Sequence, residues 1–311
     1  PGDNNVAVGY QSLNANTTGS HITAIGKGAM LLNTTGAEST AVGTSALDAN
    51  TTGSYNIAVG GGALGSNTTA DNNTALGYTA LLANTTGTSN TAVGCLAGDS
   101  ITTGSYNTVV GHDSLRDSTT SNNNTAIGAG VMSLTTSGAR NTAMGMAALQ
   151  SNTSGNYNVA IGDQAVFRNT NGGENTGVGF LALQNTGLST SGISYNTGVG
   201  SRALAGNTSG AQNTSLGAYA GADLTSGGGN TFIGYNTQPS AVGGANQISL
   251  GHGITCTGDG NFTFGNGSSD SNIANGATTI TAPSDVRLKE DIEDEKIGLD
   301  FINDLRPVTY F

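Results

Sequence analysis

Four tyrosines recur at one position of a repeating pattern. Tyr55, Tyr106 and Tyr157 each lie five positions before a glycine that returns at every seventeenth position, and Tyr195 occupies the same place further along the chain. An exposed tyrosine ring offers an apolar body with a polar tip, which suits stacking against a sugar. Turns that need an amphipathic cover also favour tyrosine. The spacing therefore leaves a glycan-binding role and a structural role open.

Hydrolysis of a glycan would require a pair of carboxylates roughly 5 to 9.5 Å apart. No two adjacent repeats carry an acid at the same position, and Asp48 and Asp99, which share one, are three repeats apart. Pairs that combine two positions or two chains stay open. His112 and His252 directly follow the recurring glycine, at a position that also holds tyrosine, lysine and cysteine, which indicates an exposed corner. We expect no metal site and no cofactor.

The recurring glycine marks a tandem repeat that covers most of the chain. It returns at every seventeenth position from Gly9 to Gly179 and again from Gly200 to Gly251, which gives fifteen copies. A fixed short period is typical of a solenoid, in which each repeat packs only against its neighbours. Gly200 follows Gly179 four positions later than this period requires, which predicts a loop around residues 188–191.

Positions are counted here from the marker glycine of each repeat. Position −1 is apolar and position −3 is β-branched in all fifteen copies, whereas position −2 is small in thirteen. This alternation predicts a short strand, and we expect residues such as Thr74 and Leu76 to face the core. Ala75 and its equivalents at position −2 would then face outward, against a closely packed neighbour that could be another chain.

Two asparagine rows and one apolar corner complete the repeat. Asparagine stands at position −4 in twelve copies and recurs at position +7, so stacked amides can hydrogen-bond along the axis. Segments such as 16–19, Asn-Thr-Thr-Gly, predict a tight turn that ends in a left-handed glycine. Ala-Leu pairs at positions +3 and +4, such as Ala46-Leu47, predict a second buried corner.

These patterns predict an all-β chain, with a parallel β-solenoid (β-roll) shaft of about fifteen coils over residues 1–255. A solenoid has exposed end strands, so we expect capping or oligomerisation. The Asn-Thr-Ala-Val-Gly copies followed by Ala-Leu resemble the head repeats of trimeric autotransporter adhesins. This resemblance implies a left-handed parallel β-roll that assembles as a homotrimer.

The composition changes near residue 283. Residues 256–283 form a predicted β-rich neck, in which Gly265 follows Gly251 three positions sooner than the period requires. The segment 1–283 holds 17 charged side chains, whereas the much shorter segment 284–311 holds 12, so the latter forms a separate unit. Apolar residues at spacings of 3 and 4 predict an amphipathic helix in this unit that ends at Pro307. They are Ile297, Phe301, Ile302 and Leu305.

The unit at 284–311 resembles the start of the intramolecular chaperone found at the C-terminus of phage endosialidase tailspikes and many tail fibres. The matching runs are SDVRLKEDI at 284–292, GLDFI at 298–302 and LRPV at 305–308. The resemblance implies a domain that trimerises the fibre and is released by self-cleavage between Pro283 and Ser284. Ser284 would be the nucleophile and Lys289 its base. Alternatively, Ser284 caps a turn and Lys289 is a solvated charge.

Composition limits the partners further. The net charge of −11 argues against a nucleic-acid partner, and no apolar run reaches the roughly 20 residues that cross a bilayer. Cys95 and Cys256 lie about nine copies apart, about 43 Å at ~4.8 Å per coil, so we expect them to be unpaired. The chain begins in mid-repeat, which indicates a piece of a longer polypeptide.

The resemblances and the repeat together favour a structural and adhesive fibre over an enzyme. We expect a phage tail fibre on the virion tail that contacts a host cell-surface glycan or protein receptor and other tail proteins, with no membrane insertion. The alternatives are a glycan-depolymerising tailspike and a bacterial surface adhesin. Threonine rows also occur on ice-binding solenoids, but the expected burial of position −1 argues against that activity.

Overall fold

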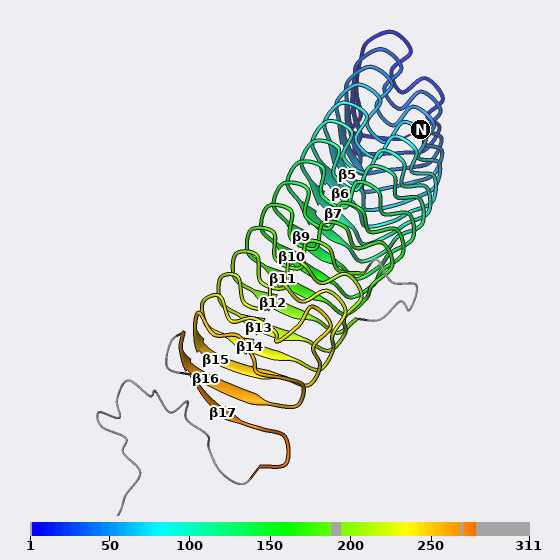
Figure 1. Ribbon diagram of the computed structural model, residues 1–311. Coiled ribbons are helices and arrows are strands. Elements are labelled where there is room, and N and C mark those ends of the chain that lie inside the picture. The colour runs from blue at the N-terminus through cyan, green and yellow to red at the C-terminus, as the bar shows by residue number, and fades with distance from the viewer. Residues whose placement is uncertain (1, 188–193, 268–269, 278–311) are drawn as a thin grey trace, which may run out of the picture.

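The computed structural model describes residues 2–187, 194–267 and 270–277, which form a rod with its strands stacked in single file along one side (Figure 1). No helix occurs among these residues. The loop predicted around 188–191, the helix predicted near 297–305, Ser284 and Lys289 lie outside them. The strands are β1 (Val6–Val8), β2 (Thr23–Ile25), β3 (Thr40–Val42), β4 (Ile57–Val59), β5 (Thr74–Leu76), β6 (Thr91–Val93), β7 (Thr108–Val110), β8 (Thr125–Ile127), β9 (Thr142–Met144), β10 (Val159–Ile161), β11 (Thr176–Val178), β12 (Thr197–Val199), β13 (Thr214–Leu216), β14 (Thr231–Ile233), β15 (Ile248–His252), β16 (Phe262–Asn266) and β17 (Ser271–Ile273).

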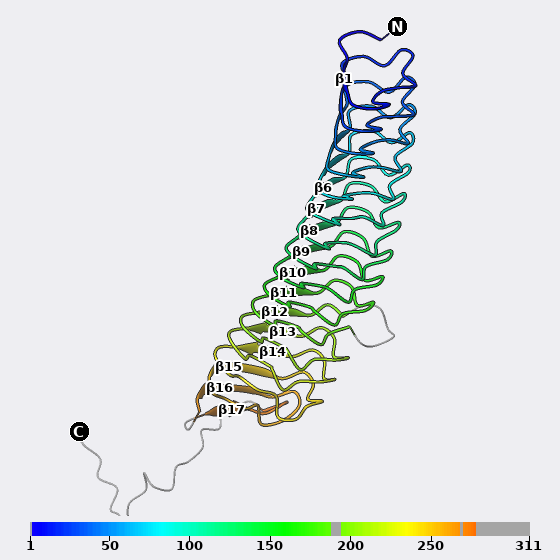
Figure 2. The same cartoon turned by 90° about the horizontal axis from the view of Figure 1, so that it is seen from above.

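Each strand up to β15 pairs in parallel with the strand of the next repeat, position against position (Figure 2). The register survives the long interval, since Thr176 of β11 lies opposite Thr197 of β12. It also survives the short one, since Gly251 lies opposite Gly265 of β16. Strand β17 then runs antiparallel to β16 and covers this edge of the sheet. The predicted parallel β-solenoid of about fifteen turns is confirmed.

The predicted orientation of the strands is wrong. Ala75 is completely buried, whereas Leu76 is 46% exposed and Thr74 is only partly buried. A Cβ added to Gly177, at the same position as Ala75, would lie 2.6 Å from Val166 Cγ2. Side chains from the opposite wall therefore fill the narrow coil and leave room only for a small residue behind the strand. The alanines cannot form a contact between chains.

The predicted Ala-Leu corner is confirmed and supplies most of that filling. Ala80 and Leu81 are both fully buried, as are Ala46 and Leu47. Leu81 has φ of 51°, in the left-handed region that costs an L-residue roughly 1–2 kcal/mol. Burying a leucine side chain contributes about 1.5–3 kcal/mol, which offsets that strain. This balance explains why leucine rather than glycine usually holds position +4.

Two repeats fill the core differently. Position +4 is glycine at Gly98 and Gly221, and in each case the next repeat carries a large residue at position −2, Val109 and Phe232. Both large residues are fully buried. A Cβ added to Gly221 would lie 2.6 Å from Phe232 Cδ2, so the ring occupies space that a leucine fills elsewhere. The core is still filled, but the large side chain comes from position −2 and not from position +4.

The two asparagine rows hydrogen-bond as predicted. At position −4 the backbone N–H of Asn73 donates to Asn56 Oδ1 at 2.9 Å, and Asn73 Nδ2 donates to the Gly87 carbonyl at 2.9 Å. At position +7 Asn67 Nδ2 donates to Asn50 Oδ1 at 2.9 Å. These buried amides are stable because each finds partners in the adjacent coil.

Glycine is required at two positions for close approach between coils. A Cβ added to the marker glycine Gly77, which has φ of +145°, would lie 2.3 Å from the Gly94 carbonyl oxygen. In the turn, a Cβ on Gly19 would lie 2.2 Å from the Gly36 carbonyl oxygen. Gly19 does not adopt the predicted left-handed conformation. Contact with the next coil, and not a special φ, is the reason for the turn glycine.

Candidate functional site

The four tyrosines lie on an exposed edge of the rod, immediately before the strands. Their exposed fractions range from 48% to 62%. Position −5 is left-handed in every repeat, whatever residue occupies it. We call this series the corner row. It consists of Asn4, His21, Glu38, Tyr55, Asn72, Ser89, Tyr106, Asn123, Arg140, Tyr157, Glu174, Tyr195, Gln212, Gly229 and Asn246.

The tyrosines do not form one cluster, because they are two or three coils apart, or about 10 to 14 Å at ~4.8 Å per coil. They also differ in their surroundings. The Arg140 guanidinium lies 5.3 Å from the centre of the Tyr157 ring, and Arg140 Nη1 donates a hydrogen bond to the Tyr157 hydroxyl. One face of Tyr157 is therefore covered. Tyr106 has small polar neighbours in the row, Ser89 and Asn123.

A hollow opens beside the corner row near the N-terminal end of the described rod. Its volume is about 520 Å3, and it is lined by His21, Glu38 and Thr40. His21 Nε2 lies 3.3 Å from Asn4 Nδ2 of the preceding coil. Sequence reasoning missed this site. The sequence did contain a signal for it. Two of the three replacements of the position −4 asparagine, Ile22 and Ser39, directly follow the lining residues His21 and Glu38.

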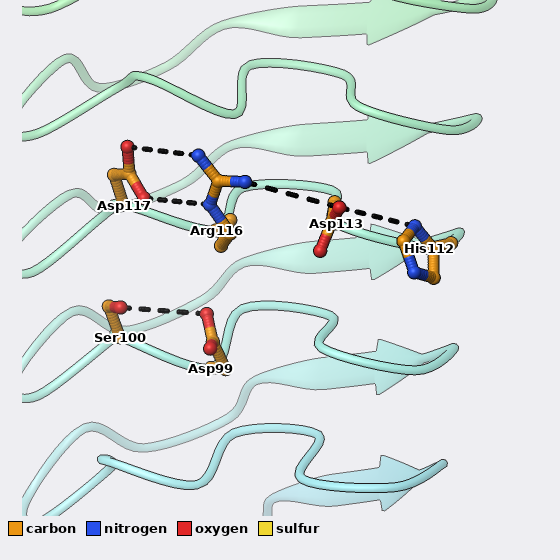
Figure 3. Close-up of polar contacts among 6 residues, drawn as sticks. All are labelled: Asp99, Ser100, His112, Asp113, Arg116 and Asp117. Carbon is orange, nitrogen blue, oxygen red and sulfur yellow. Dashed lines mark hydrogen bonds and ion pairs between the residues drawn. The ribbon is translucent and has the colours of Figure 1, made fainter.

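A charged group spans two adjacent coils on another face of the rod, as Figure 3 shows. Arg116 Nε donates to Asp117 Oδ1 at 2.9 Å, and its Nη1 lies 4.0 Å from Asp113 Oδ2. His112 Nδ1 is 3.3 Å from the same Asp113 oxygen. Asp99, one coil below, accepts a weak 3.5 Å hydrogen bond from Ser100. The acidic residues of this group come from different positions of two adjacent repeats, which is a combination of carboxylates that the sequence left open.

Burial raises the pKa of Asp99 above its usual range, and the nearby Arg116 opposes that shift. A carboxyl with a raised pKa can serve as a proton donor. However, Arg116 engages Asp117 through two nitrogens, and both side chains are about 40% exposed. Exposed ion pairs of this kind contribute little free energy and screen readily. The group can hold charges in place but presents no free carboxylate pair.

The remaining reactive side chains do not converge. His252 stacks on Tyr235 with ring centres 5.2 Å apart. Cys95 and Cys256 are both free, and burial raises the pKa of the Cys256 thiol to about 11, which makes it unreactive. Within residues 2–187, 194–267 and 270–277, no three His, Cys, Asp or Glu side chains come together to hold a metal ion.

The most extensive surface feature is apolar. We call position −1 of the fifteen repeats the aliphatic stripe; its side chains point outward from consecutive strands and include Leu76, Leu216 and Leu250, which are 46%, 51% and 47% exposed. The β-branched residues of position −3 lie beside it on the same face, and neither position carries a charged residue. The stripe consists of Val8, Ile25, Val42, Val59, Leu76, Val93, Val110, Ile127, Met144, Ile161, Val178, Val199, Leu216, Ile233 and Leu250.

Comparison with known proteins adds no further constraint. No family model, curated protein or solved structure matches the chain. In the part of the chain that the structure describes, no helix is long and apolar enough to cross a membrane.

Proposed function

We propose that this chain is the shaft of a structural and adhesive fibre, a tail fibre that serves in host attachment and assembles as a homotrimer. The aliphatic stripe carries this proposal. The fifteen apolar side chains form one uncharged row, in which seven are exposed and eight are partly buried, and an extended apolar face of this kind marks an interaction site. A second and third copy of the chain would cover them.

The size of the face supports this assignment. Fifteen coils at ~4.8 Å and strands about 10 Å wide give a face of roughly 700 Å2, close to the ~800 Å2 that each partner contributes to a stable interface. The strictly repeated register also lets every coil make the same contact. Three chains, and not two, are favoured by the resemblance of both the repeats and residues 284–311 to trimeric fibres.

The unit at 284–311 contributes the assembly step in this proposal. It would trimerise the fibre and then be released by self-cleavage. Ser284 Oγ, deprotonated by Lys289, would attack the Pro283 carbonyl carbon, so that an ester forms and the amide bond to the Ser284 nitrogen breaks. Water would then hydrolyse the ester and leave a carboxylate at Pro283 and a free amino group at Ser284. Intact-mass analysis tests this step: wild type should yield a fragment that ends at Pro283, and Lys289→Ala should remain uncut. A single uncut species for both proteins would exclude self-cleavage but would leave the stripe as the assembly surface.

Sedimentation velocity of purified chain tests the fibre directly. Wild type should sediment as a trimer, and the double variant Leu76→Lys with Val93→Lys should weaken the assembly because it places charges in the stripe. The matched control is Thr86→Lys, on the exposed turn of the same coil. A monomeric wild type, or equal dissociation of the control, would overturn the proposal.

The exposed stripe also supports a second candidate function, ice binding, because the threonines of position −3 and the apolar residues of position −1 share one accessible face. Their expected burial was the reason to set ice binding aside, and that reason is wrong. A monomer that shows thermal hysteresis would favour ice binding over the fibre. The alternatives of a glycan-depolymerising tailspike and a bacterial surface adhesin predict, respectively, cleavage that depends on Asp99 and a location on the cell surface.

A further inference from the structure

The hollow beside the corner row combines three side chains that bind uncharged hydroxyl groups well. The Glu38 carboxylate accepts hydrogen bonds, and the Thr40 hydroxyl both donates and accepts them. His21 Nε2 accepts from Asn4 Nδ2, so the imidazole can donate through Nδ1. The hollow has a volume of about 520 Å3 and is widely open to solvent, so it suits one unit of a longer surface molecule better than an enclosed small ligand. In the next coil, the corner row continues with Tyr55, whose ring is 54% exposed.

The backbone conformation of the corner row does not call for these side chains. His21, Glu38 and Tyr55 have φ of 59°, 51° and 60°. Glycine and asparagine tolerate this left-handed region best, and the corner row uses them at Asn4, Asn72, Asn123, Gly229 and Asn246. Three successive coils at the hollow carry large side chains there, as do five successive coils from Arg140 to Gln212. The left-handed conformation is thus common to the whole row, and the side chains that line the hollow distinguish this place from the rest of it.

The lining chemistry selects the ligand class. The hollow is lined by a carboxylate and by no lysine or arginine, which disfavours phosphate, sulfate and acidic sugars. A metal ion is disfavoured as well, because only His21 and Glu38 could ligate it and no third such group joins them in the described rod. A neutral sugar satisfies the site, since its hydroxyls pair with all three groups and its apolar face suits a tyrosine ring.

We propose that His21, Glu38 and Thr40, with Tyr55 as the adjoining ring, bind one neutral hexose unit of a surface glycan. This inference rests on the proposed role in host attachment and names its ligand class. The site is distinct from the other corner-row tyrosines: Tyr157 is covered by Arg140, and Tyr106 has no large polar neighbour in the row.

Saturation-transfer NMR of the whole chain with glucose, galactose and N-acetylglucosamine as probes tests the proposal. At least one sugar should receive saturation, and Glu38→Asn and His21→Asn should each weaken its binding at least tenfold. Asparagine is the row's own residue, so both variants should melt at or above the wild-type temperature. The matched controls are Glu174→Asn and Tyr106→Asn, which alter the same row elsewhere and should bind like wild type.

The outcomes separate this inference from the fibre itself. A trimer that transfers saturation to none of the three sugars would overturn the sugar site alone, and so would equal loss of binding in the control variants. A monomer that binds a sugar through Glu38 would overturn the fibre and keep the site. Loss of sugar binding in Glu38→Asn with an unchanged melting temperature and an intact trimer would support both.

Discussion

The inside of the coil and its corner row obey opposite rules, although both recur with the same period. Inside, position −2 is alanine in most copies, and its two large exceptions are each matched by a change elsewhere in the core, as with Phe232 and Gly221. In the corner row, histidine, glutamate, tyrosine, arginine and serine all occur with no effect on the backbone. The interior is fixed by packing, whereas the corner is free to carry function.

The largest expected effect comes from disrupting the packing of the Phe232 ring against Gly221. Phe232→Ala should destabilise the rod by about 3–5 kcal/mol, because it leaves a cavity beside Gly221. Gly221→Leu alone should also destabilise it, because the new side chain would meet the Phe232 ring. The double variant restores the usual pair and should be more stable than either single variant. Urea denaturation of all four proteins measures this coupling, and simple additivity would contradict the shared-space explanation.

A corresponding truncation on the outer face should cost the isolated chain much less stability than Phe232→Ala does. Leu76→Ala removes a side chain that is 46% exposed, so the unfolding free energy of the isolated chain should fall by no more than about 1 kcal/mol. Its larger effect should appear in the oligomer, where the stripe is covered. If Leu76→Ala destabilised the isolated chain as strongly as Phe232→Ala, the assignment of inner and outer faces would be wrong.

The same comparison explains which features could be predicted from the sequence. The period located every strand of the repeats, the buried Ala80-Leu81 corner and both asparagine rows. Alternation alone could not tell which face of Thr74–Leu76 is buried, and hydrophobicity favoured the wrong one, because the outward residues are themselves apolar. The decisive signal was the large Phe232 at position −2, which comes in the repeat after Gly221 and fills the space at that glycine, so positions −2 and +4 share one interior.

The candidate site was predicted less completely. The tyrosines could be found because they recur, but the hollow depends on how His21, Glu38 and Thr40 of two coils project into one space. No periodicity encodes that arrangement. The only trace in the sequence is the local replacement of asparagine by Ile22 and Ser39, which changes the support beneath the corner row.

A smaller effect should follow from interrupting the position −4 row. Asn73→Ala removes the acceptor for the backbone N–H of Asn90 and the donor to the Gly87 carbonyl. The Gly87 carbonyl keeps its hydrogen bond from Asn84 Nδ2, so only the Asn90 N–H is left without a partner, at a cost of about 1–3 kcal/mol. The control is position +7, where the asparagine row of the natural sequence is interrupted. Ile101 follows Asn84 there, and among the described residues no donor reaches the buried Asn84 Oδ1. Ile101→Ala should therefore cost packing alone.

The smallest expected effects are two pH dependences of opposite sign, at Asp48 and Asp259. Burial raises the pKa of Asp48 above its ordinary value of 3.8, so the folded state binds this proton more tightly than the unfolded state. The stability that the proton confers is complete below pH 3.8 and is lost as the pH rises through the folded pKa. Asp48→Asn should therefore melt slightly above wild type at pH 7 and lose that advantage below pH 3.8.

Asp259 should behave in the opposite way. It lies at the exposed end of the rod, where its Oδ1 accepts hydrogen bonds from the Ala245 backbone N–H and from Gln247 Nε2, both at 2.8 Å. These bonds lower the pKa of Asp259, so its stabilising contribution is present above pH 3.8 and disappears as the pH falls through the folded pKa. Asp259→Asn should melt below wild type at pH 7 and approach it in acid. Melting curves of both variants from pH 2.5 to 7 measure the difference. Shifts of the same sign would contradict the opposite effects assigned to burial at Asp48 and to hydrogen bonding at Asp259.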